Sequence, residues 1–368
     1  MNLSGGGNVL YFMKLLSHIP PRVRHWSDVF MKYIAPTLVS ALLVFWIARK
    51  IDFHQMGDII RHGVEWEWIL VMVCFGTLSH IIRGVRWGIQ LRGIGVRTSN
   101  TCNSVAIFGA YALDIFIPNS GEVWRCVFMA RRGKAPLTKV VGTDIGDRLS
   151  DLAAIIVISV LAFVLALPKF REFMTHYDFG RDILRFTDSP WPWIVAALLI
   201  GGLWTAWYFF RNTRVMRKAE HAWDEIWNGF AVLFRMPQKW LYLWLTCGIW
   251  ICYFMKTYTM FHAFGFTREL CQEPGLAYGL LPGLVVFVFG SCSMAVPSNG
   301  GLGAWNIAVI FGLSLYGISQ TEGATYSIVM WTAEVIAQLT MGLFSVVYIV
   351  RTRPRKQKST AQGSMPVQ

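Results

Sequence analysis

The sequence predicts an all-α protein that crosses a membrane several times. Of its 368 residues, 54% are hydrophobic, only 15% are charged and 17 are tryptophan, which is too apolar for one soluble core. Apolar runs recur along the chain, and the clearest are residues 194–210, 241–264 and 328–350. Such runs suffice to cross about 30 Å of hydrocarbon as helices. We expect about six spanning helices.

Two further apolar runs are interrupted where they would cross the membrane. The interruptions begin at Pro118 and Pro297, which are 179 positions apart. Proline removes a backbone donor and glycine adopts unusual backbone angles, so neither run continues as one straight helix. Irregular backbone at membrane depth is tolerated only where protein or a water-filled cavity covers it. Paired breaks therefore predict a transport or lipid-handling site, and the break residues are Pro118, Gly121, Pro297, Gly300, Gly301 and Gly303.

The basic residues predict the topology. If the N-terminus is cytoplasmic, the cytoplasmic segments carry 24 Lys and Arg and the outer segments carry 8, which is the positive-inside pattern. The cytoplasmic segments are 1–33, 83–101, 125–140, 211–239 and 351–368, and the outer ones are 49–67, 168–190, 265–276 and 318–323. We expect both termini in the cytoplasm, and the membrane to be the cytoplasmic membrane of a prokaryote. No DNA-binding motif accompanies the net charge of +13, so nucleic acid is not expected as a partner.

In this predicted topology, the two broken runs are re-entrant hairpins that enter the membrane from opposite faces. The chain then divides into two membrane halves that run in opposite directions, as in many transporters. The expected segments are a cytoplasmic amphipathic lead (1–33), a first half (34–167, hairpin near 102–130), an outer amphipathic linker (168–190), a second inverted half (191–350, hairpin near 277–317) and a basic cytoplasmic tail (351–368). The alternative is eight full-length helices with kinks.

Four ionisable residues open the run that leads to Leu167. Asp144, Arg148 and Asp151 share one helical face, and Asp147 lies between them. One interpretation is a buried ion-pair network that locks helices together. In the other, these carboxylates hold Arg148 in a polar cavity, where it meets an anionic group. A third would make the carboxylates a metal site, which Arg148 on the same helix disfavours.

Glu122 and Arg125 follow the first break at three-residue spacing, so one helical turn presents both. A guanidinium binds phosphate through a two-point fork, and we expect lipid to approach Arg125 beside the chain break. Glu122 either positions an arginine, carries a proton, or is an ordinary acid at a helix start.

Other charged residues in the apolar runs leave alternatives open. Arg83 and Arg86 either anchor a helix end at lipid headgroups or form a mouth that collects them. Lys256 and Glu334 are lone charges in two spans, and the sequence does not decide whether they pair. His80 is interpreted as a core histidine, since no second ligand stands at metal-binding spacing. The seven cysteines contain no Cys-x-x-Cys pair and predict neither a disulfide framework nor a zinc site.

The order of these motifs carries a resemblance. Arg83-x-x-Arg86-Trp87, Pro118-x-x-Gly121-Glu122-x-x-Arg125, Asp147-Arg148-x-x-Asp151 and Pro297-x-x-Gly300-Gly301-x-Gly303 follow one another. Over about residues 35–350 the set resembles the lysylphosphatidylglycerol synthase transmembrane region, or flippase-like domain family. That resemblance implies a membrane protein that moves a lipid headgroup between leaflets, such as aminoacylated phosphatidylglycerol or a polyprenyl-linked sugar. Four positions depart from the family pattern and leave the substrate open, namely Asp114, Asp147, Asn299 and Asn306.

These observations predict a translocator of an anionic or zwitterionic lipid or polyprenyl-linked headgroup, without enzymatic activity, cofactor or metal. Only 18 residues follow Val350, so aminoacyl transfer from tRNA is not expected. The candidate substrate-binding residues are Arg83, Arg86, Asp114, Glu122, Arg125, Asp144, Asp147, Arg148 and Asp151. Arg125 and Arg148 would contact phosphate, while Glu122 and Asp151 would orient them or carry a proton. The expected partners are membrane lipids, with lipid biosynthetic enzymes and a homo-oligomer left open. The alternatives are a membrane-embedded lipid-linked glycosyl or phosphate transferase and an accessory scaffold.

Overall fold

The computed structural model describes residues 41–43, 45, 48, 49, 51–117, 120–176, 190, 194, 201, 238–293 and 301–352. Apart from an isolated bridge between Val64 and Phe264, the regular elements in these ranges are helices. They are α4 (Phe53–His62), α5 (Trp66–Gly93), α6 (Asn100–Phe116), α7 (Ser120–Gly133), α8 (Leu137–His176), α12 (Lys239–Phe261), α13 (Gly265–Leu270), η2 (Pro274–Leu276), α14 (Leu280–Ser293), α15 (Ala304–Ser314) and α16 (Gln320–Arg351). The predicted all-α class is confirmed. The expected lead at 1–33, and break residues Pro118, Pro297 and Gly300, lie outside the described residues.

Four segments in the described ranges are long and apolar enough to cross a membrane. They are Trp66–Gly93, Leu137–Lys169, Pro274–Ser293 and Gln320–Arg351. Helix α12 coincides with the run expected at 241–264, and its 23 residues extend about 35 Å. The expected run at 194–210, and residues 34–48 at the start of the first half, lie largely outside the described residues. The expected number of six spans therefore stays a prediction.

Helices α6 and α16 begin at caps that the sequence encodes. Ser99 accepts a hydrogen bond from the Cys102 amide at 3.2 Å and begins α6. Ser319 and Glu322 cap each other's backbone amides and begin α16. Each cap satisfies backbone donors that a helix start leaves unpaired.

The first expected hairpin is a pair of packed helices, α6 and α7, that meet at a very short distance. A Cβ atom on Gly121 would overlap the carbonyl oxygen of Ala110, so only glycine permits this approach. The Asp114 carboxylate accepts a hydrogen bond from the Gly121 amide at 2.8 Å across the break. The end of α6 thus fixes the start of α7.

The second expected hairpin is the packed pair α14 and α15. Gly301 and Gly303 precede α15 with φ angles of 80° and 88°, which side chains other than glycine rarely adopt. The Asn306 side chain accepts a hydrogen bond from the Gly303 amide at 3.0 Å. Helix α15 has 11 residues and extends only about 16 Å, roughly half of the hydrocarbon thickness.

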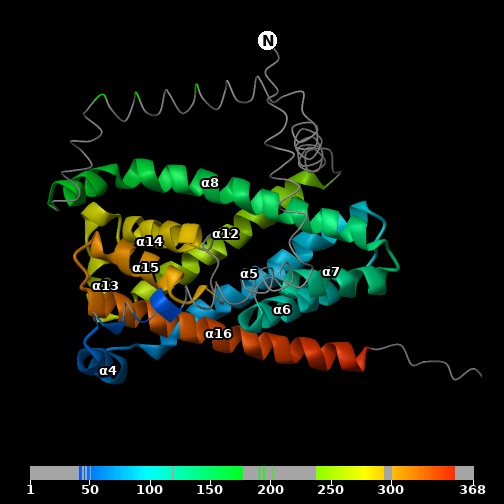
Figure 1. Ribbon diagram of the computed structural model, residues 1–368, viewed down its shortest axis with the longest axis horizontal. Coiled ribbons are helices and arrows are strands. Elements are labelled where there is room, and N and C mark those ends of the chain that lie inside the picture. The colour runs from blue at the N-terminus through cyan, green and yellow to red at the C-terminus, as the bar shows by residue number, and fades with distance from the viewer. Residues whose placement is uncertain are drawn as a thin grey trace, which may run out of the picture.

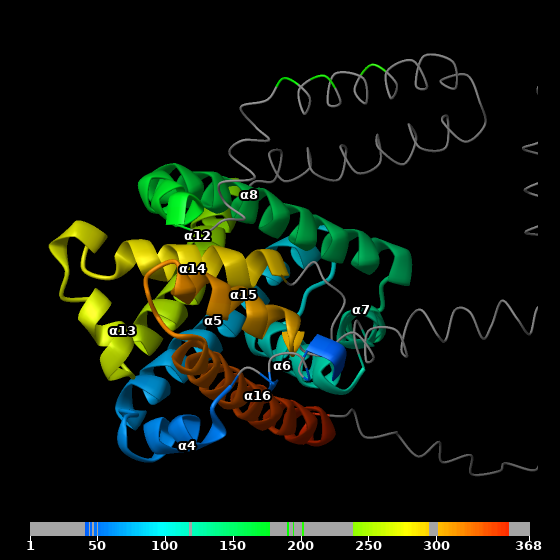
Figure 2. The ribbon, with the colours of Figure 1, turned by 60° about the vertical axis from the view of Figure 1, so that its left-hand side comes forward.

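The helices form a crossed arrangement in which each hairpin lies against the other half of the chain. Helices α5 and α12 pack together and cross the centre of Figure 1, with α8 along one side and α16 along the other. Helix α6 packs on α16, and helix α14 packs on α8. Figure 2 shows α14 and α15 between α8 and α16 from a second direction. The closing helix of each half therefore contacts the hairpin of the opposite half.

Two large hydrophobic cores support the arrangement. The first surrounds Trp87 and Met129, where α5 meets α6 and α7. The second surrounds Phe261 and Tyr326, where α12 meets α16. Many large apolar side chains of α8 and α16 instead remain exposed, as expected for surfaces that face lipid.

Candidate functional site

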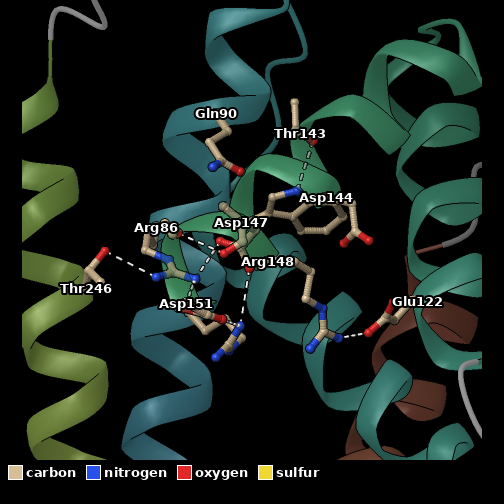
Figure 3. A network of polar contacts seen from close by, with 12 residues as sticks. Arg86, Gln90, Glu122, Thr143, Asp144, Asp147, Arg148, Asp151 and Thr246 are labelled. Carbon is tan, nitrogen blue, oxygen red and sulfur yellow. Dashed lines mark hydrogen bonds and ion pairs between the residues drawn. The ribbon is translucent and has the colours of Figure 1, made fainter. Parts of the chain in front are cut away.

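Four charged side chains of α5 and α8 form a closed ion-pair network. Arg83 lies 3.3 Å from Asp147 and 2.6 Å from Asp151, and Arg86 lies 2.7 Å and 2.8 Å from the same carboxylates. Figure 3 shows Asp147 and Asp151 projecting from α8 toward α5. The spacing of three residues along α5 and four along α8 places each pair of like charges on one helical face.

This network is buried and is completed by hydroxyl groups of α12. Arg86 and Asp147 have fully buried side chains. Arg86 donates to the Thr246 hydroxyl at 3.2 Å, and Arg83 donates to the Tyr253 hydroxyl at 3.3 Å. The expectation that Arg83 and Arg86 anchor a helix end at lipid headgroups is therefore wrong. Helix α5 continues to Gly93, which places both arginines inside it, beside the carboxylates of α8.

A second ion pair joins α7 to α8. Arg125 pairs with Asp144, and the side chains are only 3% and 10% exposed. The Arg125 guanidinium also lies over the Trp87 ring, 4.9 Å from its centroid. Trp87 donates its indole N–H to the Thr143 hydroxyl at 3.0 Å, which fixes the orientation of the ring next to the guanidinium. Arg125 is thus enclosed rather than open to an approaching lipid.

A third ion pair joins the same two helices but is open. Arg148 of α8 pairs with Glu122 in the first turn of α7, and their side chains are 47% and 30% exposed. In Figure 3, Arg148 points away from the buried network toward Glu122. Glu122 therefore positions an arginine, which was one of the interpretations of the sequence.

The predicted partners of Arg148 are wrong. Asp144 and Asp151 share its helical face, but Asp144 pairs with Arg125, and Asp151 pairs with Arg83 and Arg86. The physical reason is that α8 packs against both α5 and α7, so neighbouring positions on one face reach different partners. The prediction that Asp151 orients Arg125 or Arg148 is wrong for the same reason.

The burial of three arginines also changes the count of basic loop residues from which the membrane topology was predicted. Arg83, Arg86 and Arg125 were counted as loop charges in the cytoplasmic segments, but all three lie inside helices and are paired. The positive-inside bias falls from 24 against 8 to 21 against 8 and keeps its direction. The orientation stays a prediction.

Asp114, the candidate residue not yet placed, lies outside this network. Its carboxylate accepts the hydrogen bond from the Gly121 amide and so joins the two sides of the first break. The carboxylates of Asp144, Asp147 and Asp151, which were considered as metal ligands, are each paired with arginine. In the described ranges no group of three His, Cys, Asp or Glu residues is arranged to hold a metal ion.

Lys256 and Glu334 do pair. The Lys256 Nζ lies 2.8 Å from a Glu334 oxygen, which joins α12 to α16. The other Glu334 oxygen accepts from the Gln338 amide at 3.2 Å and lies 3.9 Å from His80 Nε2. His80 is buried and contacts the Tyr111 ring in a tilted arrangement with ring centroids 4.2 Å apart. The two lone charges of the sequence thus form a second polar cluster.

The pair Lys256–Glu334 occupies the same register as the pair Arg83–Asp151. Arg83 and Lys256 each lie 17 positions after the first residue of their helices, α5 and α12. Asp151 and Glu334 each lie 14 positions after the first residue of α8 and α16. In each half, a cation of the helix that precedes the hairpin therefore pairs with a carboxylate of the helix that follows it.

Several polar side chains that support the site were not singled out from the sequence. Gln90 donates to the Tyr242 hydroxyl at 2.9 Å, and Ser150 lies 2.7 Å from the same hydroxyl. The sequence does contain a pattern that could have identified such residues, namely polar side chains spaced three and four positions apart along an otherwise apolar helix. In α5 that pattern comprises Ser79, His80, Arg83, Arg86, Trp87 and Gln90, all of which are buried.

Comparison with known proteins shows the family of the chain. The profile of the family described as the lysylphosphatidylglycerol synthase TM region matches residues 33–342. The chain belongs to this family. Membership confirms the resemblance carried by the arginine, carboxylate and break motifs.

One relative of the family is the UPF0104 membrane protein PH1989 of Pyrococcus horikoshii. It is 29% identical over 140 residues, which cover 36% of this chain and 39% of the relative. The aligned part thus spans well under half of that relative's length, and its printed name specifies a membrane protein without an activity. No solved structure matches the chain.

Proposed function

We propose that this protein translocates a lipid with an anionic or zwitterionic headgroup, or a polyprenyl-linked headgroup, between membrane leaflets. The observation that carries the proposal is the half-exposed pair Glu122–Arg148 beside the first helix break. An arginine fork suits a phosphate group, and this one is held in place next to a buried polar network. We propose a transporter rather than an enzyme.

The charge balance of the site dictates how phosphate would bind. Four arginines and four carboxylates face one another in the three sets of ion pairs described above. A phosphate can therefore bind an arginine only by replacing a carboxylate, since adding an anion to a balanced buried site is costly. Arg148 gives up its carboxylate at the lowest cost because water already screens that pair. Arg125 is too enclosed to be the first contact.

The inverted-repeat interpretation supports alternating access to such a site. The register shared by Arg83–Asp151 and Lys256–Glu334, together with the reciprocal packing of α6 on α16 and α14 on α8, is what two related halves would produce. The short helices α7 and α15 are consistent with hairpins that enter the membrane without crossing it. We further propose the cytoplasmic membrane as its location, with both termini in the cytoplasm.

A reconstituted leaflet-exchange assay tests the proposal. Fluorescent phosphatidylglycerol, a polyprenyl phosphate and a neutral glycolipid of similar size would be followed in vesicles with and without the protein. We expect protein-dependent exchange of the two phosphate-bearing lipids that is at least several-fold faster than exchange of the neutral lipid. Equal exchange of all three lipids would contradict phosphate recognition. No exchange would favour the alternative of an accessory scaffold, in which the ion pairs only hold the helices together.

A further inference from the structure

The polar cluster of Lys256, Glu334 and His80 lies near the middle of the membrane-spanning helices. His80 is near the midpoint of α5, about 20 Å from either end, and Glu334 is near the midpoint of α16. Ionisable groups at that depth are costly and usually functional. The ion pairs of Arg125 and Arg148 are formed by other helices, so this cluster is a separate site.

The cluster is enclosed by side chains from four helices. The groups that face Glu334 and His80 are His80 and Arg83 from α5, Tyr111 from α6, Tyr253 and Lys256 from α12, and Gln338 from α16 itself. Gly76, one turn before His80, faces the pair, and a Cβ atom there would lie 3.5 Å from the Lys256 side chain and 3.7 Å from Glu334. A side chain larger than alanine at Gly76 would meet the ion pair.

His80 has polar atoms that the closed cluster leaves unused. Its side chain is 3% exposed, yet within the described part of the chain neither ring nitrogen has a hydrogen-bond partner. Buried polar groups are normally hydrogen-bonded, so an unpaired imidazole needs an explanation. Its Nε2 faces the Glu334 carboxylate at 3.9 Å, which is slightly beyond hydrogen-bond distance.

The two equivalent ion pairs differ in one chemical property. The first-half pair uses arginine, which keeps its proton in proteins, and Arg83 is held by two carboxylates. The second-half pair uses a lysine held by one carboxylate, and beside it lies the imidazole of His80, a group that can accept a proton. We call these two equivalent ion pairs, Arg83–Asp151 and Lys256–Glu334, the first-half and second-half latches. The first-half latch is permanently charged, whereas the second-half latch can exchange a proton.

We infer that Glu334, His80 and Lys256 form a proton-binding site that opens and closes the second-half latch. A proton from water forms an O–H bond at the Glu334 oxygen that faces His80 and neutralises the carboxylate, which releases Lys256. His80 Nε2 accepts that proton when the O–H bond breaks, and the restored carboxylate pairs with Lys256 again. The proton then leaves His80 to water. Only the coupling of this cycle to lipid movement rests on the proposed function.

The first arm of the test measures proton binding without lipid transport. Infrared difference spectra of the purified full chain between about pH 5 and 8 would follow the carbonyl band of a protonated buried carboxyl group. We expect the band in wild type, its loss in Glu334→Gln, and a shifted titration in His80→Asn. The matched control is Asp151→Asn in the other latch, which should keep the band. Thermal melting would verify that each variant is folded.

The second arm separates this inference from the proposed function. Leaflet exchange would be measured in vesicles with and without an imposed pH gradient, and we expect the gradient to change the wild-type rate several-fold but not the Glu334→Gln rate. A wild-type spectrum without the band, or a band that persists in Glu334→Gln or ignores His80→Asn, would overturn the proton site even if exchange occurs. A Glu334-dependent band without any lipid exchange would uphold the proton site and contradict the proposed function.

Discussion

Arg148 and Arg125 bind carboxylates across the same pair of helices, but only Arg148 remains accessible. The Arg148–Glu122 pair keeps 47% and 30% of its side-chain surface exposed, whereas the Arg125–Asp144 pair keeps 3% and 10%. Burial decides what each pair contributes, because water screens the first and not the second. The two arginines therefore have different predicted roles despite their shared chemistry.

Replacement of Arg125 by alanine should destabilise the protein. The change leaves the Asp144 carboxylate buried without its cation and removes the guanidinium that lies over Trp87, which costs about 3–5 kcal/mol for a buried pair. Thermal melting in detergent measures the loss. The double variant Arg125→Leu with Asp144→Leu should recover much of it, and a double variant that melts no higher than Arg125→Ala would contradict the argument.

Replacement of Arg148 by alanine should leave folding nearly intact but reduce lipid binding. A half-exposed pair contributes at most about 1 kcal/mol, so the melting temperature should stay close to wild type. Mass spectrometry of copurified phospholipid should show a several-fold loss. Arg148→Lys should restore little, because an ammonium lacks the planar fork. The exposed Arg131 of α7 provides the matched Arg→Ala control, and equal lipid retention in Arg148→Ala and Arg131→Ala would count against phosphate binding.

Replacement of Gly121 by alanine should push α6 and α7 apart. The new Cβ would overlap the backbone of Ala110, which cannot move away as a flexible side chain does. We expect a clear fall in melting temperature. Gly142→Ala in α8 is the control, because nothing lies within 4 Å of a Cβ there and alanine favours the helix. If Gly121→Ala melts like Gly142→Ala, the close packing of the hairpin is wrong.

Cysteine labelling should place the ends of each hairpin on one face of the membrane. With the seven native cysteines replaced, single cysteines at exposed positions 97 and 132 should react from one side, and those at 273 and 320 from the other. If positions 97 and 132 react from opposite sides, α6 and α7 together cross the membrane once and do not form a re-entrant hairpin.

The sequence was sufficient for the fold class and the family but not for the ion-pair partners. Apolar runs and Pro-Gly breaks are local features, so the spans at α5, α8 and α16 and the two helix pairs could be predicted. Partner choice depends on tertiary packing: Asp151 pairs with Arg83, which is 68 positions away, rather than with Arg148 on its own helix. Helix boundaries mattered as well, because α5 runs further than its apolar pattern and carries Arg83 and Arg86 into the interior.

The equivalent positions of the two latches within their helices could not be recognised from the sequence either. Arg83 and Lys256 are different residues on helices of different length, and Asp151 and Glu334 likewise differ. No identity marks them as equivalent, and only helix starts fixed by the structure align them. The pair Lys256–Glu334 therefore could be suspected from its cost in a membrane but not assigned.

Leaflet exchange of phosphatidylglycerol by wild type, Arg148→Ala and Arg131→Ala, reconstituted at equal density, tests the central claim most directly. The account predicts protein-dependent exchange that falls at least tenfold in Arg148→Ala and is retained in Arg131→Ala, with all three proteins folded. Exchange that survives unchanged in Arg148→Ala would contradict a mechanism in which the headgroup phosphate replaces Glu122 on Arg148.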